Sequence, residues 1–258
     1  MSSATQGTSD NAEGQNLTLA ENFQKYFAVE FVTSSRQRSD VYRIRYRVYC
    51  DEFEYEPAHL FPDGEEHDEF DGHSLHCLIR HRASQMPAGC VRLVPAVGNA
   101  SEELLPFEKH CKKSLDEAYI SGLNLDRRTI CEISRLAVDG AFRRRSGEAL
   151  TRFGEIDALD CSQQEKRTFS LIAVAGFLAA TALTDLTGRN NVFAMMEPFL
   201  PRLMQRSGIV FQRAGRDINY HGIRAPYFIT TQLALGSMKP ELNELYRTVR
   251  NQIELTYR

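Results

Sequence analysis

Arginines and carboxylates recur between residues 45 and 135, inside segments that otherwise consist largely of apolar residues. The arginines are Arg45, Arg92 and Arg135, and the carboxylates are Glu66, Asp68, Asp71 and Glu132. Buried charge persists only where it is paired or used in chemistry. We therefore expect a carboxylate–arginine cluster able to bind an amine and a carboxylate at once, which are the two groups that an amino acid presents.

The segment Cys131–Leu136 reads as an apolar strand that carries a charge on each face. Strict alternation places Glu132 and Ser134 on one face and Arg135 on the other, unless a bulge intervenes. Arg92 repeats this pattern in a second apolar strand. Each charge by itself indicates a structural ion pair with a neighbouring strand, whereas the two together favour a polar cleft between strands.

Glu66, Asp68 and Asp71 belong to an acidic loop, Pro-Asp-Gly-Glu-Glu-His-Asp-Glu-Phe-Asp. Such a loop by itself indicates a solvated surface or, less often, a calcium site, and its spacing does not fit an EF-hand. We predict no metal site.

The bulk composition narrows the class of protein. The chain has 258 residues, 42% hydrophobic and 25% charged, and its net charge of −3 argues against a general nucleic-acid binder. Six dispersed cysteines without a C-x-x-C pair predict reduced core residues and a cytoplasmic location, with zinc or disulfides as the alternatives. The polar N-terminus has no signal-peptide pattern, and the longest apolar stretch, Leu171 to Leu183, is too short to span a membrane.

The local patterns predict one α/β domain over residues 21–258, preceded by a disordered tail at 1–20. A polar stretch at 147–166 interrupts this domain. The expected strands are Ala28–Thr33, Leu75–His81, Cys90–Val94, Ile130–Val138, Asn191–Met196, Val210–Arg213 and Tyr227–Thr231, with a turn at Pro87–Gly89. The expected helices are one capped by Ser39 and running through Val48, a short turn at Pro106–Cys111, and helices at Thr168–Leu186, Phe199–Arg206 and Glu241–Leu255.

The arginines and carboxylates between residues 45 and 135, together with three aromatic residues, resemble the signature of LuxI-type acyl-homoserine-lactone synthases. Its parts are Arg45-x-x-x-Tyr49-x5-Tyr55, Glu66-x-Asp68-x-x-Asp71, Arg92, Phe107 and Glu132-x-x-Arg135. Tyr55 departs from that family, which has tryptophan there.

The sequence around these positions is more similar to another branch of the same superfamily. YRIRYRVYCDEFEYEP, DGHSLHCLIR, CVRLVP and Tyr220-His-Gly-Ile-Arg-Ala-Pro-Tyr227 resemble the PEP-CTERM/exosortase-associated acyltransferases and bacterial N-acyl amino acid synthases. The resemblance extends from about Phe23 to the end of the chain. It implies the GNAT (N-acetyltransferase-like) fold, an α/β fold with a mixed central sheet flanked by helices.

The resemblance also implies an activity: transfer of a long-chain fatty acyl group from an acyl carrier protein thioester to the α-amine of an amino acid. It implies Glu66, Glu132 and Arg135 as catalytic candidates, with Glu66 first as the base. The other members, together with Ser134, then become candidates for substrate binding. The backbone N–H groups near Ser134–Leu136 would polarise the thioester carbonyl.

Arg144-Arg145-Ser146-Gly147-Glu148-Ala149 fits an R-x-x-G-x-A phosphate loop for pantetheine. A solvated basic turn explains Arg143, Arg144, Arg145 and Gly147 equally well, and a patch that docks acidic acyl carrier protein is a third interpretation.

We expect no permanently bound cofactor. Acyl-phosphopantetheine, on acyl carrier protein or as acyl-CoA, enters as co-substrate, and the lipid product would add peripheral membrane contact. The alternatives are an acyl-homoserine-lactone (autoinducer) synthase that uses S-adenosylmethionine, and a non-catalytic GNAT-like module that binds acyl carrier protein.

Overall fold

A computed structural model describes residues 17–98, 103–143, 165 and 168–257. The strands are β1 (Phe27–Phe31), β2 (Leu75–His81), β3 (Pro87–Pro95), β4 (Ile130–Val138), β5 (Asn191–Met196), β6 (Gln212–Arg213), β7 (Ile218–Asn219) and β8 (Ile223–Thr230). The helices are α1 (Leu19–Tyr26), α2 (Ser35–Arg45), α3 (Pro106–His110), α4 (Glu117–Gly122), α5 (Gly140–Arg143), α7 (Leu171–Thr187), α8 (Phe199–Gln205), α9 (Thr231–Ser237) and α10 (Pro240–Tyr257). A π-helical segment, Tyr46–Glu52, continues α2.

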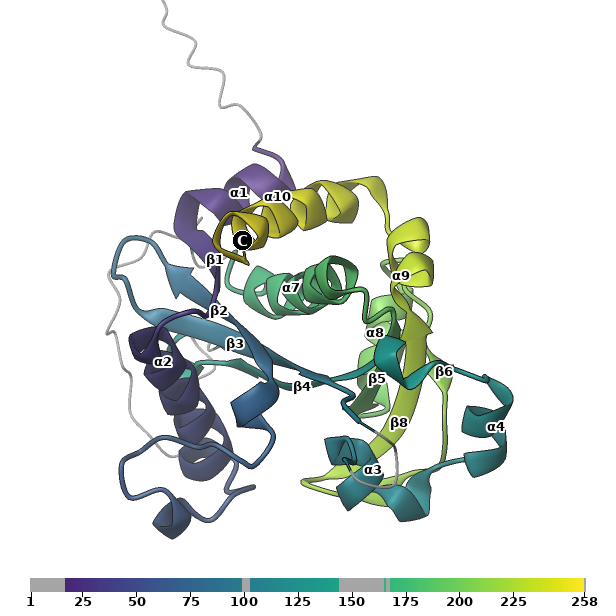
Figure 1. Ribbon diagram of the computed structural model, residues 1–258. Coiled ribbons are helices and arrows are strands. Elements are labelled where there is room, and N and C mark those ends of the chain that lie inside the picture. Colours follow the sequence, from purple (N-terminus) through teal and green to yellow (C-terminus); the bar gives the residue numbers. More distant parts are fainter. Residues whose placement is uncertain (1–16, 99–102, 144–164, 166–167, 258) are drawn as a thin grey trace, which may run out of the picture.

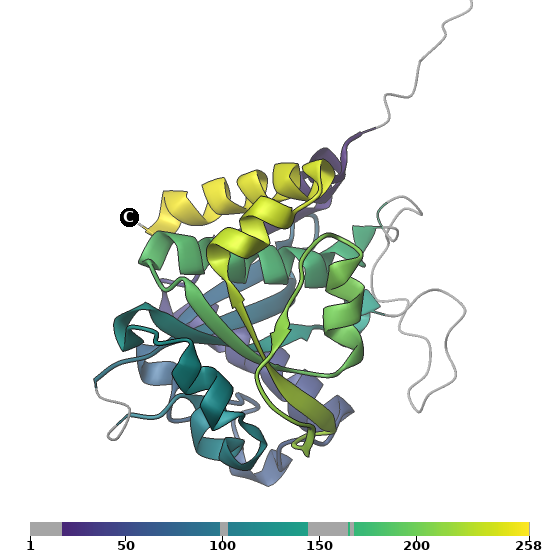
Figure 2. The same cartoon turned by 90° about the vertical axis from the view of Figure 1, so that its right-hand side faces the viewer.

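The strands form one mixed sheet in the order β1-β2-β3-β4-β5-β8-β6, with β7 paired to β8. Helix α7 packs on β2, β3 and β4, and α10 covers α7 and β1, whereas α2 packs on the opposite face (Figure 1). Figure 2 shows α10 lying across α7 as a second helical layer. Helix α7 approaches β4 closely at Gly176, where an added Cβ would lie 2.5 Å from Leu136 Cδ1 and would displace that side chain. This architecture confirms the predicted α/β class with a mixed sheet flanked by helices.

The sheet opens between β4 and β5. These strands are parallel and pair only through Ile130, Cys131 and Glu132. Beyond this point β4 continues along β3 to Val138, and β5 continues along β8 to Met196. The edge of β4 that faced β5 therefore loses its strand partner after Glu132, and the two strands diverge.

A β-bulge lies on β4 at the start of this opening. Arg92 pairs with Ser134 and Cys90 with Ala137, so Arg135 and Leu136 together oppose Val91. Arg135 has φ 51°, a left-handed conformation that is costly for a residue with a long side chain. The strict alternation of side chains along β4 therefore does not continue through Arg135. The bulge that the prediction named as the exception lies there.

Several elements lie where the sequence predicts them, and others do not. Strands β2, β4 and β5 have the predicted bounds, and α3, α7, α8 and α10 agree within a few residues. Helix α2, predicted with Ser39 as its cap, is instead capped by Ser34, whose side chain accepts from the Gln37 backbone N–H and whose backbone N–H donates to the Gln37 side chain. The turn expected at Pro87–Gly89 lies within β3.

The start of the chain and four later segments also differ from the prediction. Helix α1 begins at Leu19, inside the segment assigned to the tail. The sequence patterns did not reveal α4, α5, β7 and α9. The polar stretch at 147–166 lies outside the described residues, apart from Glu165.

Within the part of the chain that the structure describes, no helix is both long enough and apolar enough to cross a membrane.

Candidate active site

Three arginines from separate elements meet the acidic loop in one buried cluster. Arg45 at the end of α2 is completely buried, donates from Nε to Glu66, and reaches Asp71 at 2.7 and 3.0 Å. Arg92 on β3 contacts Asp68 at 2.6 Å and Asp71 at 3.0 Å. The predicted carboxylate–arginine cluster is therefore present.

Arg135 joins this cluster because the bulge turns its side chain toward the loop. Its Nη2 lies 3.0 Å from Glu66, 3.3 Å from Asp68 and 3.3 Å from Glu56. Its guanidinium also lies 5.4 Å from the centre of the Tyr49 ring. Tyr49 in turn donates from its hydroxyl to the Leu136 carbonyl at 3.1 Å, so the π-helical segment holds the bulge in place.

The cluster fixes the protonation of its carboxylates. Burial by itself would raise the pKa of Glu66, but the charges and hydrogen bonds of Arg45 and Arg135 outweigh it and lower that pKa. The same opposition, through Arg45 and Arg92, holds the pKa of Asp71 well below its usual value. Both groups are firmly ionised and hydrogen-bonded to arginine, which makes them poor proton acceptors.

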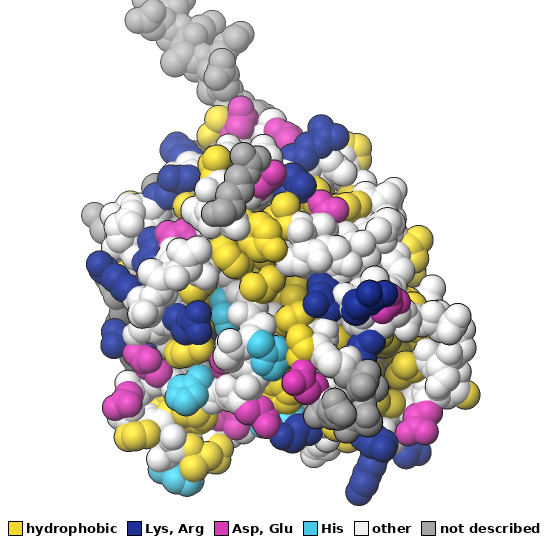
Figure 3. Space-filling model, in the orientation of Figure 1, with side chains coloured by type: hydrophobic (Ala, Val, Ile, Leu, Met, Phe, Trp, Pro, Cys, Tyr) yellow, Lys and Arg dark blue, Asp and Glu magenta, His cyan; other side chains and the backbone are white. Residues whose placement is uncertain are grey.

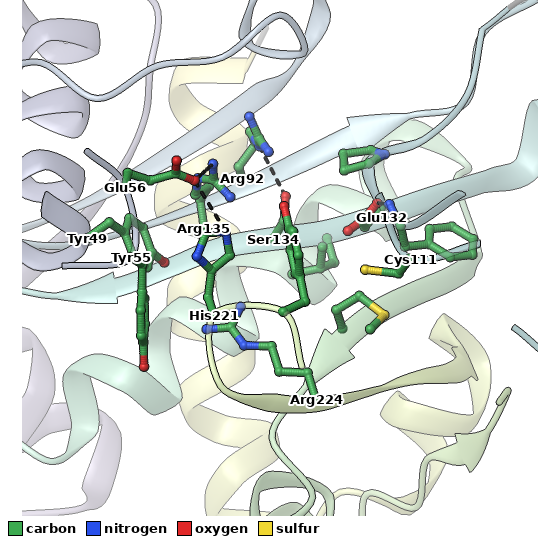
Figure 4. A pocket seen from close by; sticks show the side chains of 15 residues that line it. Tyr49, Tyr55, Glu56, Arg92, Cys111, Glu132, Ser134, Arg135, His221 and Arg224 are labelled. Atoms are coloured by element: carbon green, nitrogen blue, oxygen red, sulfur yellow. Dashed lines mark hydrogen bonds and ion pairs between the residues drawn. The ribbon is translucent and has the colours of Figure 1, made fainter. Parts of the chain in front are cut away.

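A small polar pocket of about 50 Å³ lies beside the cluster, between β4, α3 and the end of β5. Its wall consists of Tyr49, Tyr55, Glu56, Arg92, Pro106, Phe107, Cys111, Glu132, Ile133, Ser134, Arg135, Met195, Tyr220, His221 and Arg224 (Figure 4). Ser134 accepts from Arg92 Nε at 3.1 Å, which ties the wall to the charged cluster.

Glu132 is the carboxylate in this wall that is suited to take a proton. It is 3% exposed and has one backbone partner, the Phe107 N–H, which donates to it at 2.8 Å. Burial raises its pKa to about 8, and the Phe107 hydrogen bond and the charges of Arg92 and Arg135 offset only part of this effect. A carboxyl group that titrates near neutral pH is the kind that serves as a general base.

A larger apolar cavity of about 410 Å³ continues from the polar pocket into the opening between β4 and β5. Residues 133–138 of β4 line one side, and residues of β5, α7, α8, β8, α9 and the π-helical segment line much of the rest, including Ala180, Ala194, Ile229 and Ala234. The two spaces share Tyr49, Tyr55, Ile133, Ser134, Arg135, Met195 and Arg224. On the surface, hydrophobic side chains are visible near the middle of the face in Figure 3, among interspersed basic and acidic groups.

The structure divides the predicted site residues into two sets. The wall of the polar pocket contains Tyr49, Tyr55, Arg92, Phe107, Glu132, Ser134 and Arg135. Arg45, Glu66, Asp68 and Asp71 line neither space and instead form the supporting cluster. The geometry therefore argues against Glu66 as the first candidate for the base, because its oxygens are hydrogen-bonded to two arginines and it does not line the pocket.

Arg143 lines the apolar cavity and contacts Glu52. Arg144, Arg145 and Gly147, and with them the proposed phosphate loop, lie outside the described residues.

Among the residues of the polar pocket that carry a polar or ionisable group, five were not predicted as site residues from the sequence: Glu56, Cys111, Tyr220, His221 and Arg224. The last three belong to the segment Tyr220–Tyr227, which carries part of the family resemblance and could have drawn attention to them.

Cys50, Cys77, Cys90, Cys111 and Cys131 are free and buried, as predicted for reduced core cysteines, while Cys161 lies outside the described part. Burial raises the pKa of the Cys111 thiol to about 11, so it is protonated at neutral pH. No cluster of three or more potential metal ligands occurs among the described residues.

Comparison with known proteins agrees with this architecture. The acetyltransferase (GNAT) domain family matches residues 44–152, a range that contains the arginines, the acidic loop and β4. TofI, solved in a ternary complex with an inhibitor and MTA, aligns over 84% of this chain and 98% of its own, with a TM-score of 0.57 and 17% identity. The chain has the GNAT fold.

Two further solved structures share this fold. MesI, a CoA-dependent acyl-homoserine lactone synthase, aligns over 86% of this chain and 95% of its own, with a TM-score of 0.53 and 18% identity. FeeM, an N-acyl amino acid synthase from uncultured soil microbes, aligns over 82% and 94%, with a TM-score of 0.50 and 13% identity. No curated protein sequence matches this chain.

Proposed function

We propose that this chain is an N-acyltransferase that moves a fatty acyl group from a thioester to the α-amine of an amino acid. One observation carries the proposal: Glu132, with a pKa near 8, lines a small polar pocket that shares the next residues of β4, Ile133–Arg135, with an apolar cavity between diverging strands. The polar pocket suits an amine, the apolar cavity suits an acyl chain, and the carboxylate is the neighbour in β4 of the residues that border both.

The reaction follows from these positions. Glu132 takes a proton from the ammonium group, and the neutral amine attacks the thioester carbonyl carbon. Backbone N–H groups on the unpaired edge of β4, near Ser134–Leu136, would stabilise the oxyanion. Collapse of the tetrahedral intermediate forms the amide bond and breaks the carbon–sulfur bond. The thiolate then takes up the second proton of the amine nitrogen, so that the amide, a free thiol and one released proton result.

The apolar cavity would hold the acyl chain, and its depth would limit chain length. Ala180 on α7 lines it and is buried, so Ala180→Leu would fill part of the space. We expect kcat/KM for the longest acyl donor to fall about tenfold or more, with products shifting to shorter chains. Competition between donors of different length measures this shift. Equal losses for acetyl and long-chain donors would contradict the assignment, because acetyl transfer serves as the internal control.

Mass spectrometry of lipid extracts from cells expressing this chain tests the function. The control is the Glu132→Gln variant expressed to the same level. We expect fatty acyl groups joined to an amino acid in the wild-type extract only. A purified protein that binds acyl donor but transfers nothing to any amino acid would favour a non-catalytic module.

A second candidate function is supported by the comparisons. The acyl-homoserine lactone synthases MesI and BjaI share this fold, and BjaI was solved with SAM and isopentyl-CoA. An autoinducer synthase of that kind would release acyl-homoserine lactones in the same extracts. Tyr55 in place of tryptophan and the small polar pocket favour the amino acid acceptor.

The remaining expectations stay proposals. These are acyl carrier protein rather than CoA as the donor, docking through the basic segment at 143–145, the PEP-CTERM/exosortase association, and a cytoplasmic location.

A further inference from the structure

The arginines first considered for the substrate carboxylate are already neutralised. The guanidinium groups of Arg45, Arg92 and Arg135 are paired with four carboxylates: Glu56, Glu66, Asp68 and Asp71. Arg92 Nη2 has no hydrogen-bond partner, but it is fully buried, and Nη1 of the same guanidinium contacts two carboxylates. Because negative charge exceeds positive charge in this cluster, it does not attract a further carboxylate.

Arg224 differs from these arginines. It begins the second half of the hairpin formed by β7 and β8 and lines both the polar pocket and the apolar cavity. Among the described residues, no carboxylate lies within ion-pair distance of its guanidinium, which instead lies 5.5 Å from the centre of the Tyr55 ring. Half-buried guanidinium groups usually find a carboxylate, so an arginine without one at the edge of a pocket indicates a place for an anion.

We propose that Arg224 binds the carboxylate of the acceptor amino acid while Glu132 receives the proton of its amine. This inference rests on the proposed function and adds the residue that would hold the acceptor's carboxylate. Figure 4 shows the Arg224 guanidinium beside His221, with Glu132 farther along the same pocket. A cationic guanidinium and a proton-accepting carboxyl group in one pocket match the two ends of an amino acid and fix which way the amine faces.

Electrostatics of the neighbouring groups agree with this arrangement. Burial, followed by the charges of Arg224 and Arg135, lowers the pKa of His221, so this imidazole is neutral near pH 7. His221 then adds no competing positive charge, although it lies 3.5 Å from Glu56. Arg224 thus supplies the unneutralised positive charge on this side of the pocket.

The size of the polar pocket narrows the acceptor further. The pocket is much smaller than the apolar cavity, about 50 Å³ against about 410 Å³. A compact acceptor such as glycine or alanine suits this space better than tyrosine or S-adenosylmethionine does. Pro106, Phe107, Ile133 and Met195 form the apolar part of the wall, where a small uncharged side chain would lie. The acceptor class is therefore a small, uncharged α-amino acid.

Steady-state kinetics of the full-length chain with decanoyl-CoA or decanoyl–acyl carrier protein as donor test this inference. Alanine is compared with alaninamide, which keeps the amine and replaces the carboxylate by a neutral amide. We expect Arg224→Gln to raise KM for alanine by about 10- to 100-fold while KM for the donor and kcat/KM for alaninamide stay unchanged. Arg224→Lys should recover part of the loss.

The matched control is Arg213→Gln on the adjacent strand β6, where an exposed arginine pairs with Asp217 outside both spaces. It should leave every constant unchanged. A rise in KM for the donor instead of alanine would assign Arg224 to the thioester and overturn the inference. Equal use of alanine and alaninamide by the wild type would do the same, and a preference for tyrosine or S-adenosylmethionine would overturn the size argument. If the wild type acylates no amino acid at all, the proposed function itself fails, before any variant is compared.

Discussion

Replacing Glu132 with glutamine is expected to lower kcat by about 10²- to 10⁴-fold while the protein remains folded. Glutamine has the shape of the protonated side chain and can still accept the Phe107 N–H bond, which is 2.8 Å long in the wild type. What it cannot do is remove a proton from the amine. The loss therefore measures proton transfer separately from packing.

The pH dependence adds a second readout of the same residue. With a pKa of about 8, Glu132 is mostly protonated below that pH and cannot act as a base. We expect kcat to rise about tenfold per pH unit up to about pH 8 and then level off. The profile of kcat is the one to use, because kcat/KM also contains the titration of the free amine. The Glu132→Gln variant should lack this rise.

Stability should respond to pH in the opposite sense. Because the folded protein binds the Glu132 proton more tightly than the unfolded chain does, stability falls as pH rises from the ordinary pKa of 4.5 toward 8. The glutamine variant has no such proton to lose. We therefore expect the Tm of the wild type to fall relative to that of Glu132→Gln between pH 5 and pH 8.

Glu108→Gln is a suitable control for these measurements. Glu108 lies next to Phe107 on α3, pairs with Arg127 and lines neither space. Its variant should keep the plateau kcat of the wild type and move the pH profile only slightly toward lower pH, because the charge of Glu108 is the smallest of the contributions that shift the pKa of Glu132. If Glu132→Gln also retains full activity, another group takes the proton and the assignment of the base is wrong.

The sequence predicted which residues meet at this site better than it predicted the role of each residue. Spacing brought Arg45, Arg92 and Arg135 together with the acidic loop, because charged residues in apolar segments must find partners when those segments pack. Glu66 and Glu132 were both candidates for the base, and only three-dimensional contacts separate them. Glu66 accepts hydrogen bonds from two arginines, whereas Glu132 accepts one from a backbone amide in the pocket wall.

Arg224 shows why the remainder could not be predicted from local patterns. It lies about ninety positions beyond Arg135 in the chain, and it reaches the pocket only because β8 pairs with β5 across the opened sheet. The bulge at Arg135 also depends on a distant segment, because it arises where two residues of β4 oppose one residue of β3. Long strands such as β2, β4 and β5 were predicted well because their periodicity is local, whereas the two-residue strands β6 and β7 exist only through their contacts with β8.

Replacing Arg45 with methionine is expected to destabilise the fold by about 3–5 kcal/mol. Methionine fills much of the same space, so the cost comes from charge rather than from a cavity. Without Arg45, Asp71 keeps only part of its pairing through Arg92, and Glu66 keeps only Arg135. Both carboxylates would remain buried with fewer partners. Urea unfolding at pH 7 measures the difference in the free energy of unfolding.

The pH dependence of this difference identifies its electrostatic origin. In the wild type the pKa values of Glu66 and Asp71 are depressed below their ordinary values of 4.5 and 3.8. Carboxylates of this kind stabilise the fold above their unfolded pKa and lose that contribution as pH falls through their folded pKa. The gap between wild type and Arg45→Met should therefore be largest above about pH 5 and shrink as the pH is lowered below 4.

Arg43→Met provides the matched control on the same helix. Arg43 pairs with Glu65 at 3.2 Å, but its side chain is 57% exposed, so its loss should cost about 1 kcal/mol or less. A variant at Arg45 that fails to fold while Arg43→Met folds gives the same answer as a large loss of stability. If both variants are equally stable, the buried cluster contributes little to the fold. Arg45 would then be maintained for the geometry of the pocket, through the acidic loop that it holds against Arg92 and Arg135.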